Sequence, residues 1–435
     1  MSRFPRPPLF EVVLAALIDG ARAVYRLVST ARQQVQLRLL IITALAAGSL
    51  PFLMLGYKLG TLDQTLLDPV FAVLWLLGSI AAIGAATQAK FHRLAALAMV
   101  GIAGLATCIS FVWLSAPDLG LTQLLVEIVT LVLLLLGLRW LPQRLPELWR
   151  GESIPFHVRF RRSGDLLLAV FGGGGAAAIA YAVMTRRAPD GIGDFFMQRA
   201  YSGGGGTNVV NVILVDFRGF DTFGEIIVLG IAALAIFALL ETVGTGASGR
   251  RILAWAPDTP RSPEHHPMML VVATRLLLPL ALMVGLYIFL RGHNQPGGGF
   301  IAGLVISIAI LMQYMASGYQ FAAQRLRADH HTLIGLGVLI AAATGLGSLL
   351  FGAPFMTTAF DYFSLPVIGA FELATAMLFD VGVALTVIGA VILALAQLSQ
   401  VAQSAEKQEP LPADAAMDID PSRATPRPAS TEADR

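Results

Sequence analysis

The sequence predicts an all-α, polytopic integral membrane protein of about ten transmembrane helices, with both termini in the cytoplasm. Of the 435 residues, 56% are hydrophobic and only 13% are charged, whereas a soluble domain carries roughly 25% charged residues. Ten apolar segments are each long enough to cross a bilayer, which takes about 20 helical residues. Lys and Arg concentrate in alternate loops, and the positive-inside rule then places both termini inside.

The ten segments set the predicted organisation of the chain. They lie at 36–56, 69–88, 93–115, 119–139, 164–185, 222–242, 268–290, 298–317, 332–353 and 371–397. Polar residues at 243–267 separate the first six segments from the last four.

The two ends of the chain differ from this apolar region. Residues 1–35 include apolar and basic positions at helical spacing, which predicts an amphipathic helix on the membrane surface. An ordinary cytosolic helix is the alternative. Residues 401–435 lack apolar periodicity, and we expect a disordered cytoplasmic tail there.

Composition also limits the chemistry. A net charge of +2 argues against a nucleic-acid partner, and a single cysteine, Cys108, cannot hold an iron–sulfur cluster. The pairs His265-His266 and His330-His331 lack the spacing of a helical metal site. We therefore expect no cofactor, no resident metal and no enzymatic active site.

Glu127 is the first candidate site residue, because it lies within an apolar run, 119–138, that holds no other charge. A central carboxylate in a lipid-spanning helix costs about 2.5–3.5 kcal/mol, which predicts an ion or proton relay. Gln123 and Thr130 share its helical face. The alternative is a neutral glutamate that joins two helices. Asp118, about 13 Å nearer the outer edge, is a further path candidate, with a helix cap as the simpler interpretation.

A second polar cluster precedes the sixth segment. We expect Asp221 to cap this helix, and Glu225, about one turn inside the membrane, either to lie on an ion path or to snorkel. Asp216 and Arg218 are expected to support the path or simply to pair. The cluster consists of Asn208, Asn211, Asp216, Arg218, Asp221 and Glu225.

The connection at 291–300 reads RGHNQPGGGF. Pro296 and three glycines predict a tight, non-helical loop that places His293 and Asn294 at the outer mouth. Because histidine titrates near neutral pH, His293 could pass protons to bulk water. The alternative is a loop in which the histidine is incidental.

The last segment carries two carboxylates. We expect Glu372 near the outer end of this helix and Asp380 about 12 Å deeper. Asp380, like Glu127, has no charged neighbour in its own helix, so both acids are candidates for the ion path.

Long strings of this sequence resemble one transporter family. APDLGLTQLLVEIVTLVLLLLGLRWLP and GGGGTNVVNVILVDFRGFDTFGEIIVLGIAAL resemble the C-terminal region of the large A-type subunit of Mrp-type (Mnh) cation/proton antiporters. RGHNQPGGGFIAGLVISIAILMQYMASG and ELATAMLFDVG resemble the B-type (MnhB-like) subunit of the same complexes. The resemblance implies the tail of an A-type subunit at 36–142 (MbhD-like from about 69), MbhE-like helices at 143–245, a linker at 246–267 and an MnhB-like four-helix module at 268–400.

The resemblance implies a function as well. The chain would be a subunit of a multisubunit antiporter in the cell membrane that exports Na⁺, sometimes K⁺ or Li⁺, in exchange for H⁺. Acidic residues important in the family map onto Glu127 and Glu225, and Na⁺ would bind only transiently. Expected partners are membrane lipid, the other Mrp subunits and a separate antiporter-like large subunit. The alternatives are an ion-translocating module of a hydrogenase or NADH-dehydrogenase-like complex, and a scaffold that does not transport.

Overall fold

The computed structural model describes residues 9–28, 33–57, 60–62, 66–89, 92–138, 156–187, 191–245, 268–317, 329–365 and 369–406. Among these residues, ten helices are long and apolar enough to cross a membrane, and each coincides with one predicted segment to within a few residues. The all-helical prediction is therefore confirmed, apart from one two-stranded hairpin. The predicted linker at 246–267 and residues 407–435 of the predicted tail lie outside the described residues. Residues 401–406, also predicted as disordered tail, instead form the end of the last helix.

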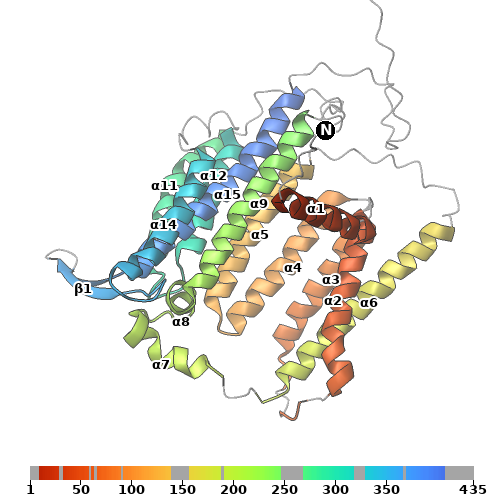
Figure 1. Cartoon of the computed structure of the whole chain (residues 1–435), viewed down its shortest axis with the longest axis horizontal. Helices are drawn as coiled ribbons and strands as arrows, with labels where there is room; N and C mark the ends of the chain where they lie inside the picture. Colours follow the sequence, from red (N-terminus) through yellow and green to blue (C-terminus); the bar gives the residue numbers. More distant parts are fainter. Residues whose placement is uncertain are drawn as a thin grey trace, which may run out of the picture. The chain divides into compact units, whose positions relative to one another are not determined.

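The chain divides into two compact units, which we describe separately (Figure 1). Unit 1 comprises Met1–Leu66 and Leu145–Gly191. Unit 2 comprises Leu67–Arg144 and Ile192–Arg435.

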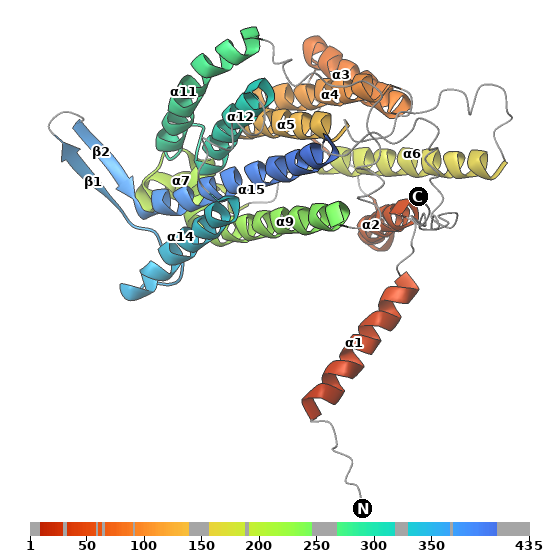
Figure 2. The same ribbon diagram turned by 90° about the horizontal axis from the view of Figure 1, so that it is seen from above.

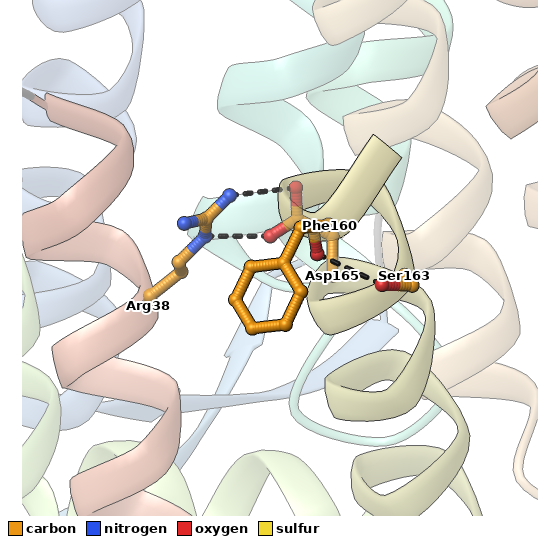
Figure 3. A network of polar contacts seen from close by, with 4 residues as sticks. All are labelled: Arg38, Phe160, Ser163 and Asp165. Atoms are coloured by element: carbon orange, nitrogen blue, oxygen red, sulfur yellow. Dashed lines mark hydrogen bonds and ion pairs between the residues drawn. The ribbon is translucent and has the colours of Figure 1, made fainter. Parts of the chain in front are cut away.

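Unit 1 holds α1 (Leu9–Val28), α2 (Gln33–Leu55) and α6 (Phe156–Met184). The predicted N-terminal helix is confirmed as α1, and its place on a membrane surface stays a prediction. Two points of contact show that α2 and α6 run in the same direction. Arg38 forms a bidentate ion pair with Asp165, with N–O distances of 2.5 and 2.8 Å (Figure 3). Further along, the Tyr57 hydroxyl donates to the Ala178 carbonyl at 2.8 Å.

Unit 2 contains the rest of the described chain. Its elements are α3 (Pro69–Gln88), α4 (Arg93–Trp113), α5 (Pro117–Leu138), α7 (Gly193–Gly204), α8 (Val209–Val212), the π-helix η2 (Ile213–Phe217), α9 (Gly219–Thr245), α11 (Met268–Arg291), α12 (Gly299–Ser317), α14 (His330–Leu350), β1 (Phe360–Leu365), β2 (Gly369–Ala374) and α15 (Thr375–Glu406).

Helix α15 is the centre of unit 2, because α9, α12 and α14 all pack against it (Figure 1). Glycines permit this close approach: a Cβ added at Gly303 of α12 would lie 3.0 Å from the Ala384 carbonyl of α15. Phe379 and Leu393 of α15 are among the largest fully buried side chains. Such small-residue contacts are typical of helix packing in membranes.

The N-terminal ends of α5, α12 and α15 meet at one end of unit 2, as hydrogen bonds between them require. The short helices α7 and α8 and the β-hairpin lie at this same end (Figure 1). Each helix N-terminus carries partial positive charge from its unpaired N–H groups. This end of the unit is therefore suited to hold negative side chains.

The hairpin corrects one prediction. The last segment was expected to be helical from residue 371, but residues 369–374 form β2, which pairs with β1 and extends beyond the start of α15 (Figure 2). Helix α15 begins only at Thr375, whose N–H donates to the Ala359 carbonyl at 2.8 Å while its hydroxyl accepts from the Ala359 N–H at 2.9 Å. Glu372 therefore lies opposite Tyr362 in a strand, not in a helix.

The ion pair of unit 1 can be tested by charge exchange. Arg38→Asp and Asp165→Arg should each lower the thermal midpoint of the solubilised protein, because like charges would then face each other between α2 and α6. The double exchange should recover about 1 kcal/mol of the loss. Additive losses in the double variant would contradict the pairing of the two helices.

Candidate functional site

The loop between α11 and α12 organises the end of unit 2 where the helix N-termini meet. Helix α11 ends at Arg291, and α12 begins at Gly299, so the predicted non-helical connection is confirmed. Gly298 has a φ of +108°, which glycine adopts at no steric cost. The Arg291 side chain closes the loop by donating from Nε to the Pro296 carbonyl at 2.9 Å.

Asn208 fastens this loop to α8. Its Nδ2 lies 3.0 Å from the Gly292 carbonyl, 3.0 Å from the Gln295 carbonyl and 3.3 Å from Asp118 Oδ1. Its Oδ1 accepts from the Asn211 N–H at 3.3 Å and so caps α8. The side chain is buried. One amide therefore joins three parts of the chain at a site shielded from water.

Asp118 lies inside the first turn of α5, which begins at Pro117, so it does not cap the helix as predicted. Its Oδ1 instead accepts the Gly297 N–H at 3.0 Å. The Gly297 N–H is available to the carboxylate because N–H groups at the start of a helix have no carbonyl acceptor within that helix. Asp118 thus ties α5 to the loop.

Asp380 is buried in the second turn of α15, and its Oδ2 accepts the Gly299 N–H at 2.6 Å. Because α15 starts at Thr375, Asp380 lies only about 7.5 Å along the helix. The predicted separation of about 12 Å from Glu372 assumed one helix through both residues, which the strand at Glu372 contradicts. Both acids at the loop, Asp118 and Asp380, hold backbone N–H groups near the start of α12.

His293 is buried and does not face bulk water as predicted. Its Nε2 lies 2.7 Å from the Gly204 carbonyl, which can only accept, so this nitrogen carries a proton. Its neighbour Asn294 is exposed, and Asn294 Oδ1 accepts the Thr207 N–H at 3.1 Å. His293 thus attaches the loop to the end of α7, and Asn294 attaches it to the segment between α7 and α8.

Glu127 is half-buried in α5 and points at α4. A Cβ added at Gly104 of α4 would overlap the Glu127 carboxyl group. Gln123 Nε2 donates to Glu127 Oε2 at 3.5 Å, which agrees with the predicted shared face, while Thr130 is exposed. The carboxyl group therefore lies between two helices, where a glycine leaves room for it.

An apolar groove of about 600 Å³ runs between α3, α4 and α5. It reaches Ala103, the residue before Gly104, and Leu134, two turns beyond Glu127. Its lining consists of Ala82, Ala85, Ala86, Ala89, Arg93, Ala96, Leu97, Val100, Ala103, Leu134 and Leu138. Apart from Arg93 these side chains are apolar, so the groove offers little to hydrate a proton or a cation.

The second polar cluster is only partly brought together. Arg218 pairs with Asp221, not with Asp216, and Asp221 lies inside α9 instead of capping it. Glu225 is exposed. Within the part of the chain that the structure describes, no hydrogen bond or ion pair joins Glu127, Glu225 and Asp380.

Asp216 lies in the π-helix η2, a rare conformation that often marks a functional position. Burial raises the pKa of the Asp216 carboxyl, while a hydrogen bond from Thr358 and the nearby His293 act to lower it. Its Oδ2 is buried with no hydrogen-bond partner. The carboxyl group is therefore more stable in its protonated form than an exposed aspartate would be.

Sequence reasoning missed two features of this site. Gly104 carried no signal, since one glycine in an apolar helix is common. The central role of Asn208 was also missed, although the run TNVVN contained a sign of it, because asparagine is a frequent helix cap. Only the three-dimensional contact with residues of the α11–α12 loop reveals its importance.

Family models match three successive stretches of this chain. Residues 77–143 match the MbhD family, residues 160–247 match the MbhE family, and residues 269–393 match a "domain related to MnhB subunit of Na+/H+ antiporter". The B-type subunit of the Na⁺/H⁺ antiporter of Bacillus subtilis (strain 168) is 44% identical over 122 residues, which cover 28% of this chain and 85% of that protein. The chain belongs to the Mrp-type cation/proton antiporter subunits.

Two longer relatives agree with this Mrp-type assignment. A protein of Rhizobium meliloti (strain 1021), named as a probable K⁺/H⁺ antiporter subunit of combined A/B type, is 50% identical over 404 residues, which cover 90% of this chain and 40% of that protein. A chain of the Mrp complex from Dietzia sp. DQ12-45-1b superposes with a TM-score of 0.69 at 29% identity, covering 89% of this chain and 41% of that one. This chain thus spans about two fifths of their length.

The Mrp-type subunit therefore joins MbhD- and MbhE-type parts, as in the C-terminal region of the large A-type subunit, to an MnhB domain. It is a multi-pass membrane protein of a transporter family, not an enzyme.

Asn208→Ala should lower the stability of this Mrp-type subunit by about 2 kcal/mol, because it removes the amide donor from the buried Gly292 carbonyl. Thermal unfolding of the solubilised protein measures the loss. Asn294→Ala, which removes an exposed amide from the same loop, is the matched control and should cost less. Equal losses in the two variants would contradict the special role of Asn208.

The raised pKa of Asp216 predicts a pH-dependent effect. An acid whose pKa is higher in the folded state stabilises the fold fully below its unfolded pKa, and this contribution is lost as pH rises through the folded pKa. Asp216→Asn should therefore raise the thermal midpoint at pH 7, and the gain should vanish near about pH 3.5. Asp194→Asn, at an exposed position in α7, should bring no gain at pH 7. A lower midpoint for Asp216→Asn at pH 7 would reverse this interpretation.

Proposed function

We propose that this Mrp-type subunit takes part in exchanging a monovalent cation for protons across the cell membrane, with Glu127 as an alternately protonated relay. The observation that carries the proposal is the position of Glu127: it is inside an apolar helix, against Gly104 of α4 and hydrogen-bonded by Gln123. An acidic side chain at membrane depth is a functional-site hypothesis by default.

The surroundings of Glu127 suit both of its charge states. The Gln123 amide can donate to a carboxylate and can accept from a protonated carboxyl group after rotation. Gly104 leaves space at the helix contact that a larger side chain would fill. A relay needs this tolerance, because its charge changes in every cycle.

Water must reach Glu127 for proton exchange, and the apolar groove beside it offers Arg93 as its one polar lining side chain. We infer that the hydrated route is completed at a surface of the chain where another subunit packs. Proposed partners are the remaining subunits of a Mrp complex, including an antiporter-like large subunit. Both termini would lie in the cytoplasm. A membrane potential contributes about 2.3 kcal/mol per charge for each 100 mV to steps that move charge across the bilayer.

We propose K⁺ as the first cation to test, ahead of the Na⁺ expected from the sequence. The relative that matches 90% of this chain carries K⁺/H⁺ in its name. The B-type relative of Bacillus subtilis, which is named for Na⁺/H⁺, matches 28% of the chain. Neither name refers to this chain, so the assay must compare both cations.

A scaffolding role is the second candidate, and it is favoured at other predicted path residues. Asp118 and Asp380 each accept a backbone N–H near the start of α12, and His293 Nε2 donates to the Gly204 carbonyl. Such contacts suit an anchor. We therefore restrict the relay to Glu127, with Glu225 as the next candidate because its exposed side chain is available to a neighbouring subunit.

Glu127→Gln should abolish cation-dependent proton movement in membrane vesicles that contain the assembled complex, because glutamine cannot take up or release a proton. Glu127→Asp should retain part of the activity and shift its pH profile. K⁺- and Na⁺-dependent collapse of an imposed pH gradient is the measurement. Undiminished exchange in Glu127→Gln, with normal amounts of complex, would end the relay proposal.

Two glycines of α4 provide a matched control for this experiment. Gly104→Ala places a methyl group against the Glu127 carboxyl and should reduce exchange severalfold while the acid remains present. Gly101→Ala, one turn earlier, meets only the Leu131 side chain at 3.9 Å and should be tolerated. If the two variants behave alike, the effect comes from general helix packing and not from Glu127.

A further inference from the structure

We propose that the backbone of Gly297, Gly298 and Gly299 couples α5 to α15, with Asp118 and Asp380 as positioning residues at its two ends. We call these three residues the glycine strap. The inference rests on the proposed function and extends it, because it joins the helix that carries Glu127 to the central helix of the MnhB-type part.

The strap presents two N–H groups to two acids from different helices. The Gly297 N–H donates to Asp118 of α5 at 3.0 Å, and the Gly299 N–H donates to Asp380 of α15 at 2.6 Å. A chain advances at most about 3.6 Å per residue, so these two nitrogens are no more than about 7 Å apart. We infer that a shift of either acid reaches the other through the two planar peptide units between these nitrogens.

Only glycine fits at these positions. Gly298 has a positive φ, and its added Cβ would lie 2.6 Å from Asn211 Nδ2 and 3.3 Å from Asp380 Oδ2. A Cβ at Gly299 would overlap the Asp380 backbone carbonyl, and one at Gly297 would overlap the Ile288 carbonyl. Neighbouring atoms thus surround all three residues of the strap. Because there is little free space around it, we expect a displacement at one end of the strap to reach the other end.

Hydrogen bonds fix residues 291–296, the part of the loop before the strap. We therefore expect a displacement of Asp118 to move the strap and not this part of the loop. Asn208 Nδ2 holds the Gly292 and Gln295 carbonyls, and Arg291 holds the Pro296 carbonyl. The strap follows immediately and leads into the first turn of α12. Asn208 also contacts Asp118 directly at 3.3 Å. It is therefore a third positioning residue, which orients the carboxylate toward Gly297.

The strength of the coupling depends on charge. A hydrogen bond from N–H to a carboxylate is roughly twice as strong as one between neutral groups. Both acids also share the positive end of α12. Replacing either aspartate by asparagine keeps the side-chain shape but weakens its hold on the strap. Once the hydrogen bond at one end of the strap is weakened, weakening the bond at the other end should reduce the coupling little further.

A double-mutant cycle on the assembled complex tests this coupling. Asp118→Asn and Asp380→Asn should each lower the maximal rate of cation/proton exchange in vesicles about threefold or more, and the double variant should be no slower than the worse single variant. If the double variant loses the product of the two single effects, the two acids act independently and the inference is overturned.

Asp329 supplies the matched control pair. It also accepts a backbone N–H, from Thr332 at 3.0 Å, as the exposed N-cap of α14, and it has no link to the strap. Asp118→Asn combined with Asp329→Asn should therefore give fold-changes that multiply. Non-additivity in this control pair would overturn the inference, because the effect would then not be specific to the strap.

Hydrogen exchange provides a readout that needs neither transport nor an Asp380 variant. In the purified complex with Asp118→Asn, amides at the start of α12 and at the start of α15 should exchange faster, while those at the start of α14 should not change. Faster exchange at α12 alone would overturn the coupling and leave the Glu127 proposal intact. Conversely, unaltered transport in Glu127→Gln together with coupled exchange would remove the relay and keep the strap.

Discussion

Backbone N–H groups at the start of α12, held by acids from two other helices, are the contact on which the rest of unit 2 depends. Helix starts leave their first N–H groups without partners, and the ends of α5, α12 and α15 bring positive potential to one place. Asp118 and Asp380 supply carboxyl oxygens there, which accept the Gly297 and Gly299 N–H groups at 3.0 and 2.6 Å. The buried Asn208 completes the arrangement. Helices from the MbhD-type and MnhB-type parts are thereby fixed in register.

Glu127 obeys a different constraint. It is not held by backbone N–H groups, and its polar contact to Gln123 is a long one of 3.5 Å. The room for it comes from Gly104 on the neighbouring helix. An acid that is tightly held suits an anchor, whereas one with a weak, adaptable partner suits a group whose charge changes. This contrast is the physical reason to separate Glu127 from the two aspartates at the strap.

Much of the fold could be predicted because hydropathy and length decide which segments span a membrane. The sequence predicted all ten spans, and it predicted the non-helical loop at 291–300 from Pro296 and its glycines. The geometry of the candidate site was harder to predict from the sequence than the membrane spans. Glu372 was misplaced because Glu, Leu and Ala in the run FELA favour a helix, whereas the pairing with β1 makes this run a strand. The roles of Asp118, Asn208 and His293 depend on partners distant in sequence, which periodicity cannot reveal.

A change of protonation at Glu127 is central to the proposed exchange, and infrared difference spectroscopy of the assembled complex tests it most directly. Adding K⁺ or Na⁺ should remove the C=O band of a protonated carboxyl group, and this band should be absent from the difference spectrum of Glu127→Gln. A spectrum that shows no carboxyl change on cation addition, or one that is identical in the variant, would contradict the account.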